Sequence, residues 1–244
     1  MDATLPVRLP FQGGTASPLA LVLVPGFSGA PWDTSAFGAW RSRILVTARL
    51  PDSRSIDACA DAVEGWGAGL RGYALVGDTF GSLVTLAVAR RQPRELRAIV
   101  LSDNCVSDGG PYGAGCPHPD GRGAGGLERW VDWYLGYMRS PFDPPTTHDE
   151  VRLLFRGSCD ASTLARRLVL AGGAAAGARR GAIAVPTLVI APEDAGPMAR
   201  RPPGELINGG SETTRIVLAG TGPLMRLTHP DAYAAAVATF LDRL

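Results

Sequence analysis

The stretch Leu75-Val76-Gly77-Asp78-Thr79-Phe80-Gly81-Ser82-Leu83 decides the fold. An apolar strand at 73–76 leads into Gly-x-Thr-x-Gly, and an apolar helix at 83–91 follows it. This is the pattern of a nucleophile elbow, a sharp strand-to-helix turn that usually lifts a serine hydroxyl above a sheet. The turn strains its central residue, and Gly77 and Gly81 let the neighbouring backbone pass closely. Thr79 makes the motif unusual, because a β-branched residue tolerates such a conformation less well than serine.

Composition favours one globular domain without a polyanionic partner. The chain has 244 residues, of which 45% are hydrophobic, and this is enough to bury one substantial core. Its formal net charge of +1 gives no electrostatic reason to expect nucleic acid or an anionic membrane. All 24 basic residues are arginine, a bias that we attribute to genomic base composition in so Ala-, Gly- and Pro-rich a chain.

The sequence also predicts a soluble, cytoplasmic protein. Residues 1–12 lack the basic start and apolar run of a signal peptide, and the apolar stretch 19–24 is too short to cross a bilayer. Four cysteines lack metal-type spacing and are expected to stay reduced, so we expect neither a metal nor another cofactor; they are Cys59, Cys105, Cys116 and Cys159.

Short apolar runs alternate with helical patterns along most of the chain. This alternation predicts a mostly parallel sheet with helices on both faces. The expected strands are 7–11, 20–24, 44–48, 73–76, 98–102, 187–190 and 214–218. The expected helices include 56–70, 83–91 and a last helix at 231–244, with Pro230 in its first turn and Thr228 or His229 as its cap.

One long segment interrupts the alternation. Residues 104–183 contain no convincing strand, so we expect a helical lid inserted into a core formed by residues 1–103 and 184–244. The first lid helix carries aromatic residues at the i, i+3, i+4, i+7 spacing of one face. Such a stripe docks the lid on the body, lines an apolar pocket, or does both; its members are Trp130, Trp133, Tyr134 and Tyr137.

A second motif, Leu23-Val24-Pro25-Gly26-Phe27-Ser28-Gly29, completes the pattern. With it, the chain resembles the α/β-hydrolase family over nearly its whole length, and more narrowly the small lidded esterases, thioesterase-like proteins and C–C hydrolases. The resemblance implies a doubly wound sheet of the eight-stranded type with an α-helical lid. It also implies an oxyanion hole whose backbone donors are Phe27 or Ser28 and Phe80. Such donors survive the replacement of the family histidine by Pro25.

The resemblance fails at the acid and the base of the family's triad. The segment 186–197 is similar to the family's acid loop, but Ala195 stands in the acid position and Asp194 comes one residue early. The segment 219–231 matches the family's histidine loop without a gap, with Pro223 in the place of the histidine. Proline has no titratable group, so nothing at that position can take a proton from Thr79. Losing the histidine of a working triad costs about 10⁶ in turnover, so standard triad hydrolysis is not expected.

Other acids and bases are available along the chain. Asp103 directly follows a strand, at the end of which some family members carry their acid, and either it or Asp194 is a candidate catalytic residue. The side chain of Asp78 is expected to point away from that of Thr79. Cys105 lacks an identifiable histidine partner. The only histidines are His118 and His148 in the expected lid and His229 before the last helix, all expected to be solvated or capping residues.

Three functions remain open at this point. The favoured one is a non-hydrolytic enzyme that cyclises, rearranges or eliminates an apolar carbonyl compound, such as a specialised metabolite, with Thr79 as a hydrogen-bond donor. Its pocket would include Ser28, Pro223 and the aromatic stripe. The second is an esterase or thioesterase with Thr79 as nucleophile and a non-standard base, and the third is a ligand-binding protein without catalysis. Substrate, reaction and oligomeric state stay open.

Overall fold

A single parallel sheet forms the centre of the molecule. The structure is a computed structural model that describes residues 19–40, 42–102, 126–177, 182–195 and 212–244. Six strands lie in the order β2-β1-β3-β4-β5-β6, and every neighbouring pair is parallel. The strands are β1 (Ala20–Val24), β2 (Leu45–Thr47), β3 (Tyr73–Gly77), β4 (Leu96–Ser102), β5 (Thr187–Pro192) and β6 (Thr213–Leu218). This confirms the predicted parallel sheet, while the strand expected at 7–11 lies outside the described residues.

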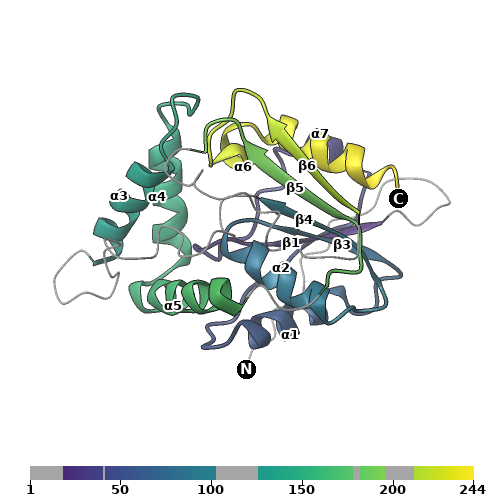
Figure 1. Ribbon diagram of the computed structural model, residues 1–244. Coiled ribbons are helices and arrows are strands. Elements are labelled where there is room, and N and C mark those ends of the chain that lie inside the picture. The colour runs from purple at the N-terminus through teal and green to yellow at the C-terminus, as the bar shows by residue number, and fades with distance from the viewer. Residues whose placement is uncertain (1–18, 41, 103–125, 178–181, 196–211) are drawn as a thin grey trace.

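Helices cover both faces of the sheet, as predicted for a doubly wound fold (Figure 1). Helices α1 (Ile56–Gly67) and α2 (Phe80–Arg90) pack on one face. Helix α7 (Pro230–Leu241) and the short 3-10 turn η1 (Gly38–Trp40) pack on the other. Successive side chains of β3 point to opposite faces, so Leu75 joins the first core and Val76 the second. Because both faces are covered, the inner strands read as continuous apolar runs.

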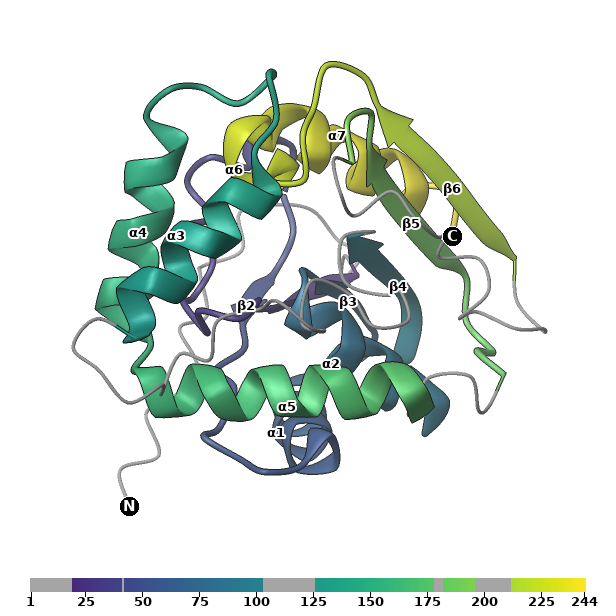
Figure 2. The same ribbon diagram turned by 60° about the vertical axis from the view of Figure 1, so that its left-hand side comes forward.

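The helices between β4 and β5 occupy two places. In the described part of the expected lid these are α3 (Gly126–Met138), α4 (Thr147–Ser158) and α5 (Ala161–Gly177), and no strand occurs among them. Helices α3 and α4 pack against each other at one end of the sheet, whereas α5 runs beside α2 (Figure 2). Helix α5 therefore extends the layer that covers the sheet, whereas α3 and α4 stand beyond the carboxyl ends of its strands.

Two predicted details of the helices were wrong. Helix α7 does carry Pro230 at its start, but neither Thr228 nor His229 caps it with a side chain. Instead, Thr228 Oγ1 hydrogen-bonds the Leu224 carbonyl at 3.2 Å and pairs with His229 Nδ1 at 2.9 Å. Those side chains are already used by the short helix α6 (Met225–Thr228), which the sequence did not suggest. Helix α2 begins directly after Thr79 rather than at Leu83, so the elbow and the helix start coincide.

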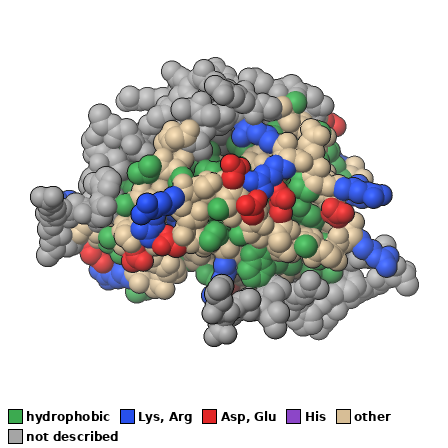
Figure 3. All heavy atoms as spheres, turned by 90° about the horizontal axis from the view of Figure 1, so that it is seen from below, with side chains coloured by type: hydrophobic (Ala, Val, Ile, Leu, Met, Phe, Trp, Pro, Cys, Tyr) green, Lys and Arg blue, Asp and Glu red, His purple; other side chains and the backbone are tan. Residues whose placement is uncertain are grey.

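The described surface carries interspersed charges. On the face shown in Figure 3, acidic and arginine side chains alternate with apolar ones. One such group joins Arg91 of the loop after α2 to three carboxylates of α1, those of Asp57, Asp61 and Glu64. Within the described ranges, no helix has the length and apolar character needed to cross a bilayer.

Candidate active site

Thr79 sits in a strained turn between β3 and α2. Its backbone has φ 47° and ψ −116°, outside the regions that residues with a Cβ ordinarily occupy. The residue is 5% exposed. The two flanking glycines predict a sharp strand-to-helix turn at Thr79, and this turn is present in the structure. Threonine accepts this conformation because the strand, the helix and both neighbouring glycines fix it from either side.

Gly77 and Gly81 permit this turn for a steric reason. A Cβ on Gly81 would lie 2.4 Å from the carbonyl oxygen of Val24 and 2.6 Å from that of Pro25. A Cβ on Gly77 would lie 2.7 Å from the Gly81 carbonyl oxygen. No side chain fits at either position, so the start of α2 lies directly against the end of β1.

The loop after β1 approaches the elbow and is fixed in orientation. The Gly26 carbonyl accepts a hydrogen bond from the Gly29 amide at 3.0 Å. Because a trans peptide holds its C=O and N–H on opposite sides, the Phe27 N–H points away from this turn. The Phe27 carbonyl in turn accepts a hydrogen bond from Nη1 of Arg167, a buried residue of α5, at 2.7 Å.

The hydroxyl of Thr79 faces this loop. Its Oγ1 lies 2.2 Å from the point where a Cβ on Gly26 would stand, so only glycine fits there. Among the described residues the hydroxyl has no hydrogen-bond partner, and in particular no base. Phe80 follows as the first residue of α2, where the backbone N–H has no acceptor within the helix.

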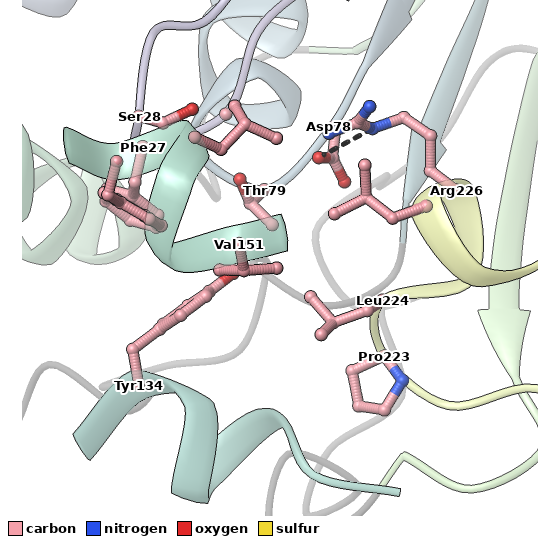
Figure 4. Close-up of a pocket in the computed structure, with 13 residues that line it drawn as sticks. Phe27, Ser28, Asp78, Thr79, Tyr134, Val151, Pro223, Leu224 and Arg226 are labelled. Atoms are coloured by element: carbon pink, nitrogen blue, oxygen red, sulfur yellow. Dashed lines mark hydrogen bonds and ion pairs between the residues drawn. The ribbon is translucent and has the colours of Figure 1, made fainter. Parts of the chain in front are cut away.

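A cavity that opens to solvent lies in front of Thr79 (Figure 4). One wall comes from the elbow and the loop after β1, and the opposite wall from α3, α4 and the loop that leads into α6. Most of the lining side chains are apolar. The lining residues are Gly26, Phe27, Ser28, Asp78, Thr79, Tyr134, Val151, Leu154, Phe155, Pro223, Leu224, Arg226 and Leu227.

Asp78 and Arg226 form an ion pair at this cavity. Arg226 Nε donates to Asp78 Oδ2 at 3.1 Å, and both side chains are about one-seventh exposed, at 14% and 13%. The guanidinium also lies over the ring of Trp32, 4.4 Å from its centroid. Asp78 was expected to point away from Thr79, and this is wrong. Asp78 Oδ2 and Thr79 Oγ1 both approach the same point above Gly26, since the tight turn brings neighbouring side chains together.

The aromatic residues of α3 have different roles: some pack the helix against the body of the protein, and one lines the cavity. Tyr134 lines the cavity. Trp130 is fully buried between Phe27, Tyr134 and Phe155 and docks α3 on the body. Trp133 and Tyr137 stack on each other at the partly buried edge of the same core, outside the cavity lining.

Of the remaining predicted acids and bases, those within the described residues do not line the cavity. Asp194 lies in the loop after β5, where its N–H donates to the Thr221 carbonyl at 3.0 Å. Within the described residues no histidine lines the cavity, because His229 stands at the start of α7 and His148 lines a separate opening. Asp103 directly follows β4, but it lies outside the described residues. Cys105 and His118 lie outside them as well.

The opening at His148 lies beside Asp143 in the turn between α3 and α4. Asp143 Oδ2 accepts a hydrogen bond from the Ser140 amide at 3.0 Å. Burial raises the pKa of the Asp143 carboxyl, an effect that this hydrogen bond and His148 and His229 oppose. The charge of Asp194 acts in the same direction as burial. This cluster joins the turn to the loops after β5 and β6 and stands apart from Thr79.

Sequence reasoning missed several residues of the cavity. Arg226 comes three positions after Pro223, and no motif marks an arginine there as a site residue. Asp78 was not predicted as a site residue, because its side chain was expected to point away from that of Thr79. Helix α4 supplies Val151, Leu154 and Phe155, which follow an ordinary amphipathic pattern. Only the position of α4 across the cavity from the elbow shows that they face the site.

Comparison with known proteins finds similarity in structure alone. No family model matches the sequence, and no curated protein matches it. A solved structure of a hydrolase from Pseudomonas aeruginosa PA01 is similar with a TM-score of 0.74 and 17% identity, over 98% of this chain and 99% of that one. The enol-lactonase from Burkholderia xenovorans LB400 also gives 0.74 and 17%, over 93% and 92% of the chains. MenH from S. aureus gives 0.73 and 15%, over 96% and 97%.

Proposed function

Because the chain has the α/β-hydrolase fold, we propose that it is an enzyme that cyclises, rearranges or eliminates an apolar small molecule with a carbonyl group. One observation carries this proposal. The hydroxyl of Thr79 faces the cavity loop with no base hydrogen-bonded to it among the described residues, and Pro223 lines the cavity where the resemblance places the catalytic histidine. The backbone of the elbow and of the loop after β1 nevertheless follows the pattern that the resemblance implies.

The chemistry follows from what that backbone offers. The N–H groups of Phe27 and Phe80 serve as donors to an oxyanion that forms on the substrate carbonyl. Phe80 also stands at the N-terminus of α2, where the helix dipole favours negative charge. Thr79 donates a hydrogen bond that orients the substrate, and α3 and α4 hold its apolar part over the elbow as a lid. Positioning and preorganised dipoles then supply the acceleration.

The test is incubation of the protein with a small-molecule extract of its source organism in H₂¹⁸O, followed by mass spectrometry. We expect one metabolite to be consumed and replaced by an isomer, or by a product of elimination, without ¹⁸O. A product that has gained the elements of water with ¹⁸O would identify a hydrolase. A metabolite that is bound and recovered unchanged would identify a binding protein.

Hydrolysis of an ester or thioester is the second candidate, and two observations favour it. Thr79 keeps the strained conformation of an elbow, and similar structures include an esterase from Exiguobacterium antarcticum (TM-score 0.71, 12% identity). This function requires a reactive Thr79 hydroxyl. A fluorophosphonate adduct on Thr79, found by peptide mass spectrometry, would therefore favour it. Absence of the adduct while a serine-esterase control is labelled would favour the non-hydrolytic function.

A further inference from the structure

A carboxylate lines the cavity directly beside the Thr79 hydroxyl. Asp78 lines the cavity beside Thr79, and its Oδ2 approaches the same point above Gly26 as the Thr79 hydroxyl does. Figure 4 shows the two side chains on the same side of the cavity, with Tyr134, Val151 and Leu224 facing them. Among the lining residues that the structure describes, only Asp78, Tyr134 and Arg226 carry an ionisable group.

The two oxygens of this carboxylate differ in their contacts. Oδ2 is held by Arg226 Nε at 3.1 Å, which fixes the carboxylate plane. Oδ1 has no hydrogen-bond partner within the described part of the chain. The guanidinium is itself held by the ring of Trp32, so it cannot easily swing away. A neighbouring cation favours the charged form of a carboxylate, which leaves Oδ1 as a fixed and open acceptor.

We propose that Asp78 is the general base of this site, held in place by Arg226, and that it removes a proton from the carbon next to the substrate carbonyl. This inference rests on the proposed function and names its chemical step. The lone pair of Oδ1 takes the proton, the C–H electron pair forms a C=C bond, and the carbonyl π pair moves to oxygen. The enolate oxygen is received by the Phe27 and Phe80 N–H groups. The protonated Asp78 then returns the proton to another carbon, which completes an isomerisation, or to a leaving group.

Among the described residues, few other ionisable groups surround Asp78. Arg226 comes from α6, and Tyr134 faces the carboxylate from α3 across the cavity. Tyr233 of α7 is a further neighbour among the described residues. Burial raises the pKa of its hydroxyl, a hydrogen bond shared with Ser102 lowers it, and the charge of Asp78 adds a further rise.

The probe for this base is 5-nitrobenzisoxazole, whose ring opens to a coloured phenolate when a base removes its single heterocyclic C–H proton. We expect the wild-type protein to accelerate this opening above the rate with free acetate at the same concentration. Asp78→Asn should lower the rate about 100-fold. Asp61→Asn makes the same change at a carboxylate with 71% of its side chain exposed, far from the cavity, and should leave the rate unchanged.

A second variant separates catalysis from structural damage. Asp78→Glu keeps a carboxylate at the same backbone position, so it should recover part of the rate that Asp78→Asn loses. A structural defect at this position would lower the rates of both variants alike. A wild-type rate no higher than that of acetate, an Asp78→Asn rate within about twofold of wild type, or an Asp78→Glu rate no higher than that of Asp78→Asn would each overturn the proposal. These outcomes do not depend on the ¹⁸O experiment, so either proposal can fail alone.

Discussion

At the scale of single residues, the site depends on positions where only glycine fits. Gly26 leaves room for the Thr79 hydroxyl, and Gly29 has φ +69° with the guanidinium of Arg167 against it. Arg167 is 6% exposed and donates to the Phe27 carbonyl, so it supports the loop that carries a proposed oxyanion donor. The glycine pattern was visible in the sequence. Its partner on α5, about 140 residues further along, was not.

Replacing Gly29 by alanine tests this support. A Cβ at Gly29 would lie 2.6 Å from both terminal nitrogens of Arg167. The alanine would also have to keep the left-handed backbone conformation of Gly29. Gly69→Ala is the matched control, because Gly69 has φ +79° and open space around it. We expect Gly69→Ala to cost about 1 kcal/mol of unfolding free energy and Gly29→Ala about 2 kcal/mol more. Urea denaturation measures the unfolding free energy of both variants. Equal losses in the two variants would show that the Arg167 side chain moves aside without loss of stability.

At the scale of elements, two pairs of segments are joined around the site. The start of α2 touches the end of β1, and the loops after β5 and β6 are joined to each other. Glu193 accepts a hydrogen bond from the Gly220 amide at 2.6 Å, and Asp194 donates its amide to the Thr221 carbonyl. These two hydrogen bonds join the loops that the resemblance associates with the acid and the histidine, and that carry Ala195 and Pro223 here.

The contact of α2 with β1 can be tested by a pair of helical glycines. Gly81→Ala would place a Cβ 2.4 Å from the Val24 carbonyl oxygen, and backbone cannot move aside as a flexible side chain can. We expect a loss of about 3 kcal/mol in unfolding free energy. Gly136→Ala in α3 meets nothing within 4 Å and should instead stabilise the protein by about 0.5–1 kcal/mol, through helix propensity alone. Urea unfolding gives both values, and a neutral Gly81→Ala would contradict the close approach.

At the scale of the whole molecule, alkaline titration reports on burial. Because the chain has no lysine, tyrosine and cysteine are the main groups that lose protons at moderately alkaline pH. Burial raises the pKa of Tyr73 to about 12 from its ordinary 10.0, and the charges of Glu64 and Glu95 add to this. Burial also raises the pKa of Tyr233 and of the thiols of Cys59 and Cys159.

These shifts predict a loss of stability in alkali. A folded-state pKa above the unfolded one means that the unfolded chain gives up its proton first. The contribution of Tyr73 is therefore complete below pH 10.0 and is lost as the pH rises to about 12. Urea midpoints measured across this window should fall for the wild type and fall less steeply for Tyr73→Phe. Both proteins should show parallel curves below the window, and parallel curves within it would contradict the assignment.

The sequence by itself determined the order of the elements. Apolar runs and glycine spacing depend on residues that are neighbours in the chain, so they located β1 at 20–24 and the elbow at Thr79. They also located the loop after β1 and the helical character of residues 126–177. The sequence alone also shows that Pro223 stands at the position where the resemblance places a histidine, because the loop pattern matches without a gap.

Only the tertiary structure decided which side chains share the cavity. Asp78 and Arg226 are separated by 148 positions, and their ion pair depends on how α6 packs against the elbow. The division of the aromatic stripe into buried Trp130 and cavity-lining Tyr134 depends in the same way on the docking of α3. A periodic pattern gives the face of a helix that is covered, but not what covers it. That depends on packing between segments far apart in the chain, for which the local sequence carries no signal.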